Sequence, residues 1–347
     1  MRVLVVNAGS SSLKLRLLGA DDGLLGARDL APEDDVDAAL DELGEADAAG
    51  HRIVHGGERF NAPTVIDDEV AVALEELTAL APLHQPKSLA ALAAVRRARP
   101  GLPEVACFDT AFHAGIPAAA ATYALPAAWR ERWPLRRYGF HGLSHAWASR
   151  RAGPGRVVTC HLGAGASLAA VRDGRCVDTT MGFTPLEGLV MATRSGSVDP
   201  GLLLWLLERT DMTERELAEA LEHDSGLRGL AGSADMRNVL AAAERDEPSA
   251  VLARDVYVHR LRAGIAAMTA ALGGLDTLVF TGGVGERAPE IRARATSGLE
   301  FLGVAVDPKR NATGADEITA PDAAARTLIV EAREDLEIAR GVRAALG

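Results

Sequence analysis

The chain carries one short design twice, at residues 3–23 and 157–174, and this internal repeat restricts the possible folds more than any other feature. Each copy runs from an apolar stretch through Asn7 or His161 and a turn of small residues into a second apolar stretch, and ends at Asp-Gly. Such a pattern is typical of two paired strands joined by a Gly-containing turn. The repeat therefore predicts two similar α/β domains, each opening with a hairpin whose turn faces a shared cleft.

The turn of the second copy, residues 161–167, consists almost entirely of small residues. Glycines such as Gly163 and Gly165 let a ligand approach the backbone closely, and exposed backbone N–H groups suit phosphate oxygens. An ordinary hairpin turn can have the same composition, so this turn by itself leaves both interpretations open.

Length and composition limit the possible functions. A chain of 347 residues exceeds what one core usually holds, so two domains are expected, with the Gly/Pro cluster at residues 153–155 as the linker. The net charge of −11 argues against a nucleic-acid partner, which would need a basic face. Cys107, Cys160 and Cys176 lack metal-ligand spacing and fit reduced thiols, and no signal segment or membrane-spanning run is recognisable. We therefore expect a soluble, cytoplasmic protein with no membrane partner.

Periodicity and capping signals predict the remaining elements. One exposed helix is expected in the acidic, Ala-rich residues 30–50, and an apolar stripe that begins at Leu252 marks a long core helix at 249–272. Ser88 is expected to cap a helix at 88–99. Further helices are expected at 144–151, after the capping box at 213–216 and at 331–345, and further strands at 105–108, 278–281 and 328–330.

Three polar side chains of the first half stand where α/β proteins often bind ligands. Arg52, in the run 51–58, belongs either to a half-exposed strand or to a strand end, where its guanidinium would grip a carboxylate or phosphate. Asp109 follows an apolar strand and is either a ligand residue or the cap of the next turn. His141 stands between two glycines and two aromatic residues after an Arg pair, which favours a functional role.

The second half adds loop-like stretches at residues 178–200, which in a compact domain are more often functional than idle, and Arg194 within them is a second candidate arginine. Asp235 and Arg237 either hydrogen-bond a base or sugar or cap the next helix. At residues 278–287 a buried strand enters a Gly-rich turn and then a helix. The glycine spacing matches neither a P-loop nor a dinucleotide fingerprint, yet it suits close approach of a nucleotide.

Together these motifs resemble the acetate and propionate kinases over nearly the whole chain. They are residues 7–14 (NAGSSSLK), 51–58 (HRIVHGGE), 108–113 (FDTAFH), 138–142 (YGFHG), 160–163 (CHLG), 178–190, 193–196 (TRSG) and 280–286 (FTGGVGE). The resemblance implies an α/β fold of two duplicated RNase H-like domains, as in the acetate and sugar kinase/Hsc70/actin superfamily, flanking an ATP cleft. The first domain would comprise residues 1–149 and the C-terminal helix 332–347 on the carboxylate-substrate side, and the second residues 150–331 on the nucleotide side.

The same resemblance implies roles for individual residues. Asn7, Asp109 and Glu334 would lie around a magnesium ion, with Asp109 as the essential acid. Arg52 and Arg194 would hold the carboxylate and the transferring phosphoryl group, and His141 would steady the transition state. The substrate methyl pocket would be formed by Val54, Leu83, Phe140 and Pro185. Nucleotide binding would fall to Lys14, His161, Leu162, Gly163, Ala164, Gly165, Asp235, Met236, Arg237, Gly283, Val284, Gly285, Glu286 and Arg287.

The implied function is reversible, ATP-dependent phosphorylation of acetate to acetyl phosphate by direct in-line transfer, which links acetate and acetyl-CoA metabolism. ATP/ADP would be the cosubstrate, Mg²⁺ or Mn²⁺ the metal, and a homodimer the assembly. Because a carboxylate is already ionised at neutral pH, the reaction needs charge neutralisation rather than a strong base. The alternatives are a propionate kinase of the same family, or a nucleotide-binding protein of the same fold with impaired transfer.

The chain departs from the family pattern at Ala164, where Asn is usual, and also at Arg287 and residues 333–335. The missing amide at position 164 would contribute about 0.5–1.5 kcal/mol as a neutral hydrogen bond. The backbone N–H groups of Gly163 and Gly165 would remain, so we expect weaker nucleotide binding or slower transfer rather than an inactive site.

Overall fold

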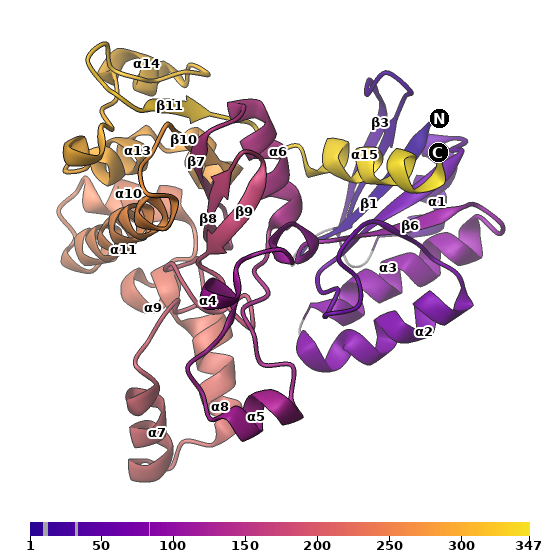
Figure 1. Cartoon of the computed structure of the whole chain (residues 1–347), viewed down its shortest axis with the longest axis horizontal. Helices are drawn as coiled ribbons and strands as arrows, with labels where there is room; N and C mark the ends of the chain where they lie inside the picture. Colours follow the sequence, from indigo (N-terminus) through magenta and orange to yellow (C-terminus); the bar gives the residue numbers. More distant parts are fainter. Residues whose placement is uncertain (10–12, 32–33, 83) are drawn as a thin grey trace. The chain divides into compact units, whose positions relative to one another are not determined.

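The computed structural model describes residues 1–9, 13–31, 34–82 and 84–347. The chain forms two compact units, each discontinuous in sequence (Figure 1). The first comprises Met1–Ala114, Phe140–Trp147 and Arg333–Gly347, and the second Gly115–Gly139 and Ala148–Ala332. The structure thus groups residues 115–139 with the second unit, whereas the division expected from the sequence assigns them to the first domain. Leu83 and the turn residues 10–12 lie outside the described residues.

The first unit is built on a six-stranded mixed sheet in the order β3-β2-β1-β4-β6-β5. Its strands are β1 (Val3–Ala8), β2 (Leu13–Leu18), β3 (Leu24–Leu30), β4 (Ala48–Ile53), β5 (Thr64–Val65) and β6 (Glu104–Phe108). Neighbours among β1, β2 and β3 are antiparallel, and so are β5 and β6, whereas β1, β4 and β6 run parallel. The carboxyl ends of these three parallel strands meet at one edge, where α/β proteins bind ligands.

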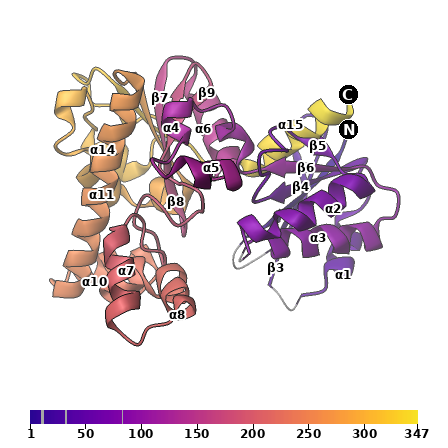
Figure 2. The same cartoon turned by 60° about the horizontal axis from the view of Figure 1, so that its bottom comes forward.

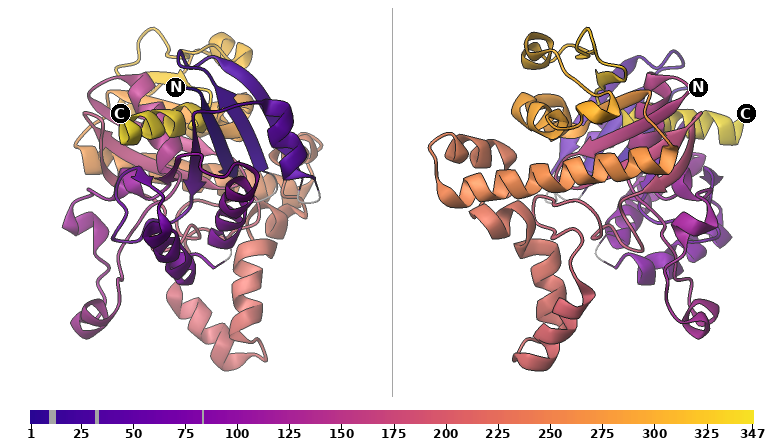
Figure 3. Two further views of the ribbon diagram at one scale, coloured as in Figure 1. Left: turned by 90° about the vertical axis from the view of Figure 1, so that its right-hand side faces the viewer. Right: turned by 60° about the vertical axis from the view of Figure 1, so that its left-hand side comes forward.

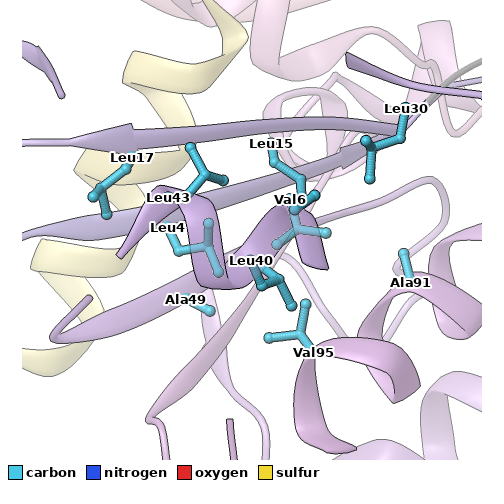
Figure 4. Packing of buried hydrophobic residues seen from close by; sticks show 11 residues of the cluster. Leu4, Val6, Leu15, Leu17, Leu30, Leu40, Leu43, Ala49, Ala91 and Val95 are labelled. Carbon is cyan, nitrogen blue, oxygen red and sulfur yellow. The ribbon is translucent and has the colours of Figure 1, made fainter. Parts of the chain in front are cut away.

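Helices cover both faces of this sheet, because the inner strands bury side chains on both sides. Leu4 and Val6 of β1 pack with Leu40 of α1 and Val95 of α3 in one apolar core (Figure 4). On the same side α2 and α3 lie side by side (Figure 2). The helices are α1 (Val36–Leu43), α2 (Asp68–Glu76), η1 (Leu77–Leu80), α3 (Gln85–Ala98), η2 (Ala111–His113) and α15 (Glu334–Leu346), together with the start of α6 (Gly142–Ala152), whose residues from Ala148 on belong to the second unit.

The opposite face is covered by α15, the last helix of the chain. Val3 and Val5, which alternate with Leu4 and Val6 along β1, pack against it. The approach is so close that a Cβ atom on Gly50 of β4 would overlap the side chains of Ile338 and Val342. A glycine at this position therefore lets the C-terminal helix dock onto the centre of the first sheet.

The second unit contains a five-stranded sheet in the order β11-β10-β7-β8-β9. Its strands are β7 (Arg156–Leu162), β8 (Ala166–Arg172), β9 (Arg175–Thr179), β10 (Thr277–Thr281) and β11 (Arg326–Ile329). Neighbours among β7, β8 and β9 are antiparallel, and β7, β10 and β11 run parallel. This arrangement repeats that of β1, β2, β3, β4 and β6, so the duplication that the repeated hairpin predicts is confirmed.

The long helix α11 (Pro248–Leu272) crosses this second sheet and contacts β7, β8 and β9; it is orange in Figure 3. The other helices of the unit are α4 (Ala118–Ala121), α5 (Ala127–Arg132), α7 (Pro200–Arg209), α8 (Glu214–Glu219), η3 (Ala220–Asp224), α9 (Gly226–Ala231), α10 (Met236–Ala243), α12 (Gly282–Arg287), α13 (Pro289–Thr296), η4 (Glu300–Leu302) and α14 (Pro308–Thr313). Neither α11 nor any other described helix has the length and apolar character that a membrane crossing requires.

Some elements differ from the sequence-based expectation. The stretch 30–50 holds only the short helix α1, because its last residues already belong to β4. The strands β3 and β9, which extend each hairpin to three strands, were not expected. In β3 Leu24 and Leu25 are exposed and Arg28 and Asp29 form ion pairs, so its hydrophobic pattern is weak.

Other corrections concern burial and helix starts. β4 is an interior strand with His51 fully buried, so the half-exposed interpretation of residues 51–58 is wrong. α3 begins at Gln85 with Pro in its first turn, and Ser88 is a buried residue inside the helix rather than its cap. Leu252 is 55% exposed and does not join the core stripe of α11. The expected Gly turn after β10 is absent, because α12 begins at Gly282.

Candidate active site

Arg52 and Asp109 contact each other at the carboxyl edge of the first sheet. Arg52 is the penultimate residue of β4, and Asp109 directly follows the neighbouring parallel strand β6. The guanidinium donates two hydrogen bonds to Oδ2 of Asp109, from Nε at 3.0 Å and from Nη2 at 2.5 Å. Its Nη1 donates to the carbonyl oxygen of Ala8 in β1 at 3.1 Å. Arg52 thus joins the ends of three strands.

One carboxylate oxygen of Asp109 is positioned to bind a further partner. Its side chain is only 1% exposed, and within the described part of the chain its Oδ1 has no hydrogen-bond donor. Burial raises the pKa of Asp109, and the negative charge of Glu334 adds to this effect, while Arg52 opposes it. A buried carboxylate oxygen without a partner is costly, so an incoming cation or donor would gain free energy by binding here.

Glu334 reaches the same cluster from the first turn of α15. Its Oε2 accepts a hydrogen bond from Nδ2 of Asn7, near the end of β1, at 2.8 Å. Burial lowers the pKa of Arg52, but the charges of Asp109 and Glu334 outweigh burial and raise it above its ordinary value. Lys14 on β2 is exposed and stands opposite Asn7 in the strand pairing.

His141 lies next to Asp109 through the backbone. The N–H of Gly142 donates to the carbonyl oxygen of Asp109 at 2.8 Å, and a Cβ atom on Gly142 would overlap that oxygen. His141 itself has a φ of 56°, which is uncommon for a residue other than glycine. Strained backbone of this kind gathers at functional sites, where the surrounding structure maintains it.

Phe140 is enclosed by buried histidines that the sequence analysis left without a role. The ring of His55 meets Phe140 edge-on, with centroids 5.6 Å apart, and Nε2 of His113 lies 3.0 Å from the carbonyl oxygen of Phe140. Burial lowers the pKa of both histidines to about 4, so both are neutral at pH 7. Val54 precedes His55 and is buried. In the sequence, His55 lies in the motif 51–58 and His113 in the motif 108–113. Because both motifs already indicated a site, this position could have identified the two histidines.

In the second unit, His161 and Leu162 end β7, and the turn to β8 follows at once. The N–H of Gly163 donates to the carbonyl oxygen of Gly165 at 2.9 Å. This group is therefore already used inside the turn, which corrects the expectation that it remains available to a phosphate. Ala164 is exposed, and its carbonyl oxygen accepts a hydrogen bond from Ala192 at 3.0 Å.

The helix α12 brings residues 283–287 to the same edge, because β10 and β7 are parallel neighbours. Gly282 has a φ of 77° and lies so close to β7 that a Cβ atom would stand 2.8 Å from the carbonyl oxygen of Leu162. The carbonyl oxygens of Gly285 and Glu286 both accept hydrogen bonds at 2.8 Å from the buried Arg292. Arg292 was not predicted, because one arginine within a helical pattern carries no sequence signal.

Arg194 and Pro185 share a loop-like segment, residues 180–199, which contains no helix or strand. The Nη1 of Arg194 donates to the carbonyl oxygen of Pro185 at 2.6 Å. Arg194 and Pro185, the two residues of this half predicted to contact the carboxylate substrate, are therefore joined by a hydrogen bond.

The predicted pair Asp235 and Arg237 lies at the start of α10. Asp235 is the N-cap of this helix and accepts from the backbone N–H of Arg237 at 2.9 Å. The guanidinium of Arg237 also bonds the carboxylate, and its hydrogen bonds hold the pKa of Asp235 below the usual range. The capping interpretation thus accounts for these contacts, while Met236 between them is buried.

The predicted residues divide between the two units. In the first unit the cluster contains Asn7, Arg52, Asp109, His141 and Glu334, with Lys14, Val54 and Phe140 in the same unit. The second unit contains His161, Leu162, Gly163, Ala164, Gly165, Pro185, Arg194, Asp235, Met236, Arg237, Gly283, Val284, Gly285, Glu286 and Arg287. Leu83 is not among the described residues.

A sequence profile of the acetokinase family matches residues 31–340. The chain belongs to the acetokinase family. An acetate kinase of Nostoc punctiforme is 48% identical over 312 residues, which cover 87% of this chain and 77% of the relative. An acetate kinase of Streptomyces avermitilis is 43% identical, and the match covers 100% of this chain and 98% of the relative.

Solved structures of acetokinases have the same fold. The acetate kinase of Porphyromonas gingivalis superposes with a TM-score of 0.90 at 35% identity, and the match covers 100% of both chains. A propionate kinase from Francisella tularensis superposes with a TM-score of 0.92 at 32% identity, over 98% of each chain. The expected fold class, two duplicated α/β domains of the acetate kinase type, is therefore confirmed.

Membership in the acetokinase family makes the chain a kinase, with ATP or ADP as cosubstrate and usually a divalent metal ion. No group of three or more His, Cys, Asp or Glu side chains that could hold a metal occurs among the residues described. The donors around Asp109 nevertheless fit a hard cation, because Mg²⁺ usually takes one or two carboxylates and completes its shell with water and phosphate oxygens. The unpaired Oδ1 of Asp109, with Glu334 nearby, has this character.

Proposed function

We propose that this acetokinase transfers the γ-phosphoryl group of ATP reversibly to acetate, forming acetyl phosphate and ADP. The observation that carries the proposal is the buried Arg52–Asp109 pair, in which one carboxylate oxygen of Asp109 has no hydrogen-bond partner among the described residues. A guanidinium suits an anionic substrate, and the unpaired oxygen suits a cation that neutralises phosphate charge. Both are needed where an anionic nucleophile meets a triphosphate.

In the proposed reaction a carboxylate oxygen of acetate attacks the γ-phosphorus in line, and the bond between that phosphorus and the bridging oxygen of ADP breaks. No proton has to be removed from acetate at neutral pH. Arg52 and Arg194 would hold the acetate carboxylate and the phosphoryl oxygens, and His141 would steady the charge that spreads over the transferring group. A bound Mg²⁺, held by Asp109, Glu334 and Asn7, would supply further charge neutralisation.

The acetate methyl group would occupy a small apolar pocket formed by Val54, Leu83, Phe140 and Pro185. The buried, neutral histidines beside Phe140 support this assignment, because they fix an apolar wall without adding charge. A propionate kinase is the second candidate, and the similarity to the Francisella tularensis propionate kinase favours keeping it. One extra methylene changes discrimination only about 10–200-fold.

The nucleotide would bind along the carboxyl edge of the second sheet, at the turn 161–165 and at residues 283–287, with the adenosine near Asp235 to Arg237; Lys14 is a further proposed nucleotide ligand. The duplicated strand order supports this, since ligands bind at carboxyl strand ends in such sheets. Because Gly163 already donates within the turn, we assign the phosphate contacts there to the remaining backbone groups of the turn.

We further propose that the enzyme is cytoplasmic and acts as a homodimer. Cys107, Cys160 and Cys176 are all buried, and among the described residues none of them forms a disulfide, as in proteins of reducing compartments. The helix α7 exposes Leu202, Leu204 and Trp205, an apolar set that a second copy of the chain would cover. Sedimentation of the purified protein would test the dimer.

The decisive experiment mixes the protein with ATP, Mg²⁺, acetate and hydroxylamine, and measures acetyl hydroxamate. Product formed in proportion to enzyme supports the transferase, and parallel measurements with propionate and butyrate rank the substrates. If well-folded protein binds ATP but forms no hydroxamate with any of the three acids, the chain is a nucleotide-binding member of the family and the proposal is wrong.

A further inference from the structure

We propose that Glu187, Arg137 and Tyr123 form a positioning network that holds the segment 180–197 in the shape in which Arg194 and Pro185 act on the carboxylate substrate. All five residues belong to the second unit. The inference rests on the proposed function, because it assigns this network to the acceptor half of the reaction rather than to the nucleotide half.

Glu187 is the centre of the network. Its Oε2 accepts a hydrogen bond from the Tyr123 hydroxyl at 2.6 Å, and its Oε1 accepts one from Nη2 of Arg137 at 2.8 Å. The guanidinium of Arg137 also lies over the Tyr123 ring, 5.6 Å from its centroid. Burial, together with Glu187, raises the pKa of Tyr123, so its hydroxyl remains a donor at neutral pH. Both carboxylate oxygens are therefore held by groups from outside the segment.

Arg137 and Tyr123 also form hydrogen bonds with the backbone of the segment. Nη1 of Arg137 donates to the carbonyl oxygens of Thr180 at 3.1 Å and Met181 at 3.0 Å, and the N–H of Phe183 donates to the Tyr123 hydroxyl at 2.9 Å. Gly182 lies between these contacts, and a Cβ atom there would overlap the Glu187 carboxylate and the Tyr123 hydroxyl. Thr180, Met181 and Phe183 are thus each hydrogen-bonded to Arg137 or Tyr123 through the backbone.

From this anchored part the constraint reaches Arg194. Pro185 stands two residues before Glu187, and its carbonyl oxygen accepts the hydrogen bond from Nη1 of Arg194 at 2.6 Å. The two arms of the segment are joined where Ser197 donates its N–H to the carbonyl oxygen of Gly188 at 3.0 Å and accepts from the Gly188 N–H at 3.1 Å. A shift of Glu187 would therefore move Pro185, whose carbonyl oxygen orients Arg194.

The cost of ordering explains why such a network is needed. Fixing each backbone residue costs about 1–2 kcal/mol, and residues 180–197 form no helix or strand that would repay it. Arg137 and Glu187 are only 17% and 35% exposed, so their ion pair is less screened than a surface pair. The network thus replaces regular secondary structure as the support of a substrate-binding segment.

The test compares Glu187→Ala, Glu187→Gln and Tyr123→Phe with the wild type in the hydroxamate assay, with acetate and ATP varied separately. For Glu187→Ala we expect the KM for acetate to rise about tenfold, which corresponds to about 1.4 kcal/mol, with the KM for ATP within twofold of the wild type. Glu187→Gln, which can still accept from Tyr123, should restore part of the loss. The ratio of kcat/KM for acetate over propionate should also fall in Glu187→Ala.

The matched control is Asp276→Asn, which weakens the paired contact between Arg156 and Asp276 in the same unit. This pair lies at the amino ends of β7 and β10, away from the segment, so both KM values should stay unchanged. If Glu187→Ala leaves the acetate KM unchanged, or raises the KM values for acetate and ATP equally, the positioning role is refuted. Absence of hydroxamate from the wild type would instead refute the proposed function, and this inference with it.

Discussion

Replacement of Arg52 by alanine would remove the partner of a buried carboxylate. In the folded chain Arg52 donates twice to Oδ2 of Asp109 and once to Ala8, and its side chain is 15% exposed against 1% for Asp109. Removing one member of a buried ion pair costs about 3–5 kcal/mol, because the remaining charge stays buried without compensation. Since Arg52 is not fully buried, we expect a loss near the lower end, about 3 kcal/mol.

The loss should depend on pH in a defined direction. The pKa of Asp109 is already raised by burial in the presence of Arg52, and removal of the guanidinium would raise it further. A carboxyl group with a raised pKa binds its proton more tightly in the folded than in the unfolded state, so the free energy of unfolding falls as pH rises through the folded pKa. Arg52→Ala should therefore lose less stability at pH 5 than at pH 8.

The measurement is chemical unfolding at pH 5, 6.5 and 8 for Arg52→Ala, Asp109→Asn and the double variant, together with the hydroxamate rate. The double variant has no buried charge left uncompensated, so it should be more stable at pH 8 than Arg52→Ala alone. Activity in Arg52→Ala should fall at least about 10²-fold, as when one charge-stabilising donor is lost. If Arg52→Ala is as stable as the wild type at pH 8, or if its free energy of unfolding depends no more on pH than that of the wild type, the buried pair with Asp109 does not stabilise the fold as argued.

Further predictions concern both units. Arg194→Ala should cut turnover about 10²-fold or more with an unchanged circular dichroism spectrum; near-normal turnover would mean that this arginine is misassigned. Ala164→Asn should tighten ATP binding or speed turnover up to about tenfold, measured by calorimetry and initial rates, unless the turn does not contact phosphate. Gly282→Ala should destabilise by about 2 kcal/mol or more, since φ is positive and the backbone of β7 is in contact, while Gly283→Ala, with open space around it, should not. The pKa of His113 is lowered by burial to about 4, so the unfolded state binds more protons below its ordinary value of about 6.5; stability should fall as pH drops from about 6.5 to 4, and less so in His113→Gln.

Local sequence signals located some of the single candidate residues, and the family resemblance supplied the others. Arg52, Asp109 and His141 stand out because each follows or ends an apolar run, or lies among glycines, and the structure places all three at the carboxyl edge of one sheet. Signals of this kind depend on neighbours in the chain, so they are visible in one sequence. They fail where the pattern is diluted, as in β3, whose charged residues hide its strand character.

Contacts between distant segments were not readable in the same way. Asn7 and Glu334 are separated by 327 positions and meet only because α15 docks across β1, β4 and β6. The network of Tyr123, Arg137 and Glu187 is likewise assembled from three segments of irregular structure. No periodicity marks such residues, since their positions follow from long-range packing rather than from helical or strand repeats.

The sequence by itself determined the duplicated α/β architecture, because a repeated strand–turn–strand pattern with buried strands has few ways to hide its apolar faces. It also determined which residue types are present for charge neutralisation of a carboxylate and a phosphate. Only the tertiary structure decided that Arg52 bonds Oδ2 of Asp109 while Oδ1 finds no partner in the described part of the chain, and that the N–H of Gly163 donates within its own turn. The reason is that differences of a few tenths of an ångström decide which atoms form a hydrogen bond. Such differences are set only when the whole sheet, its helices and its loops pack together.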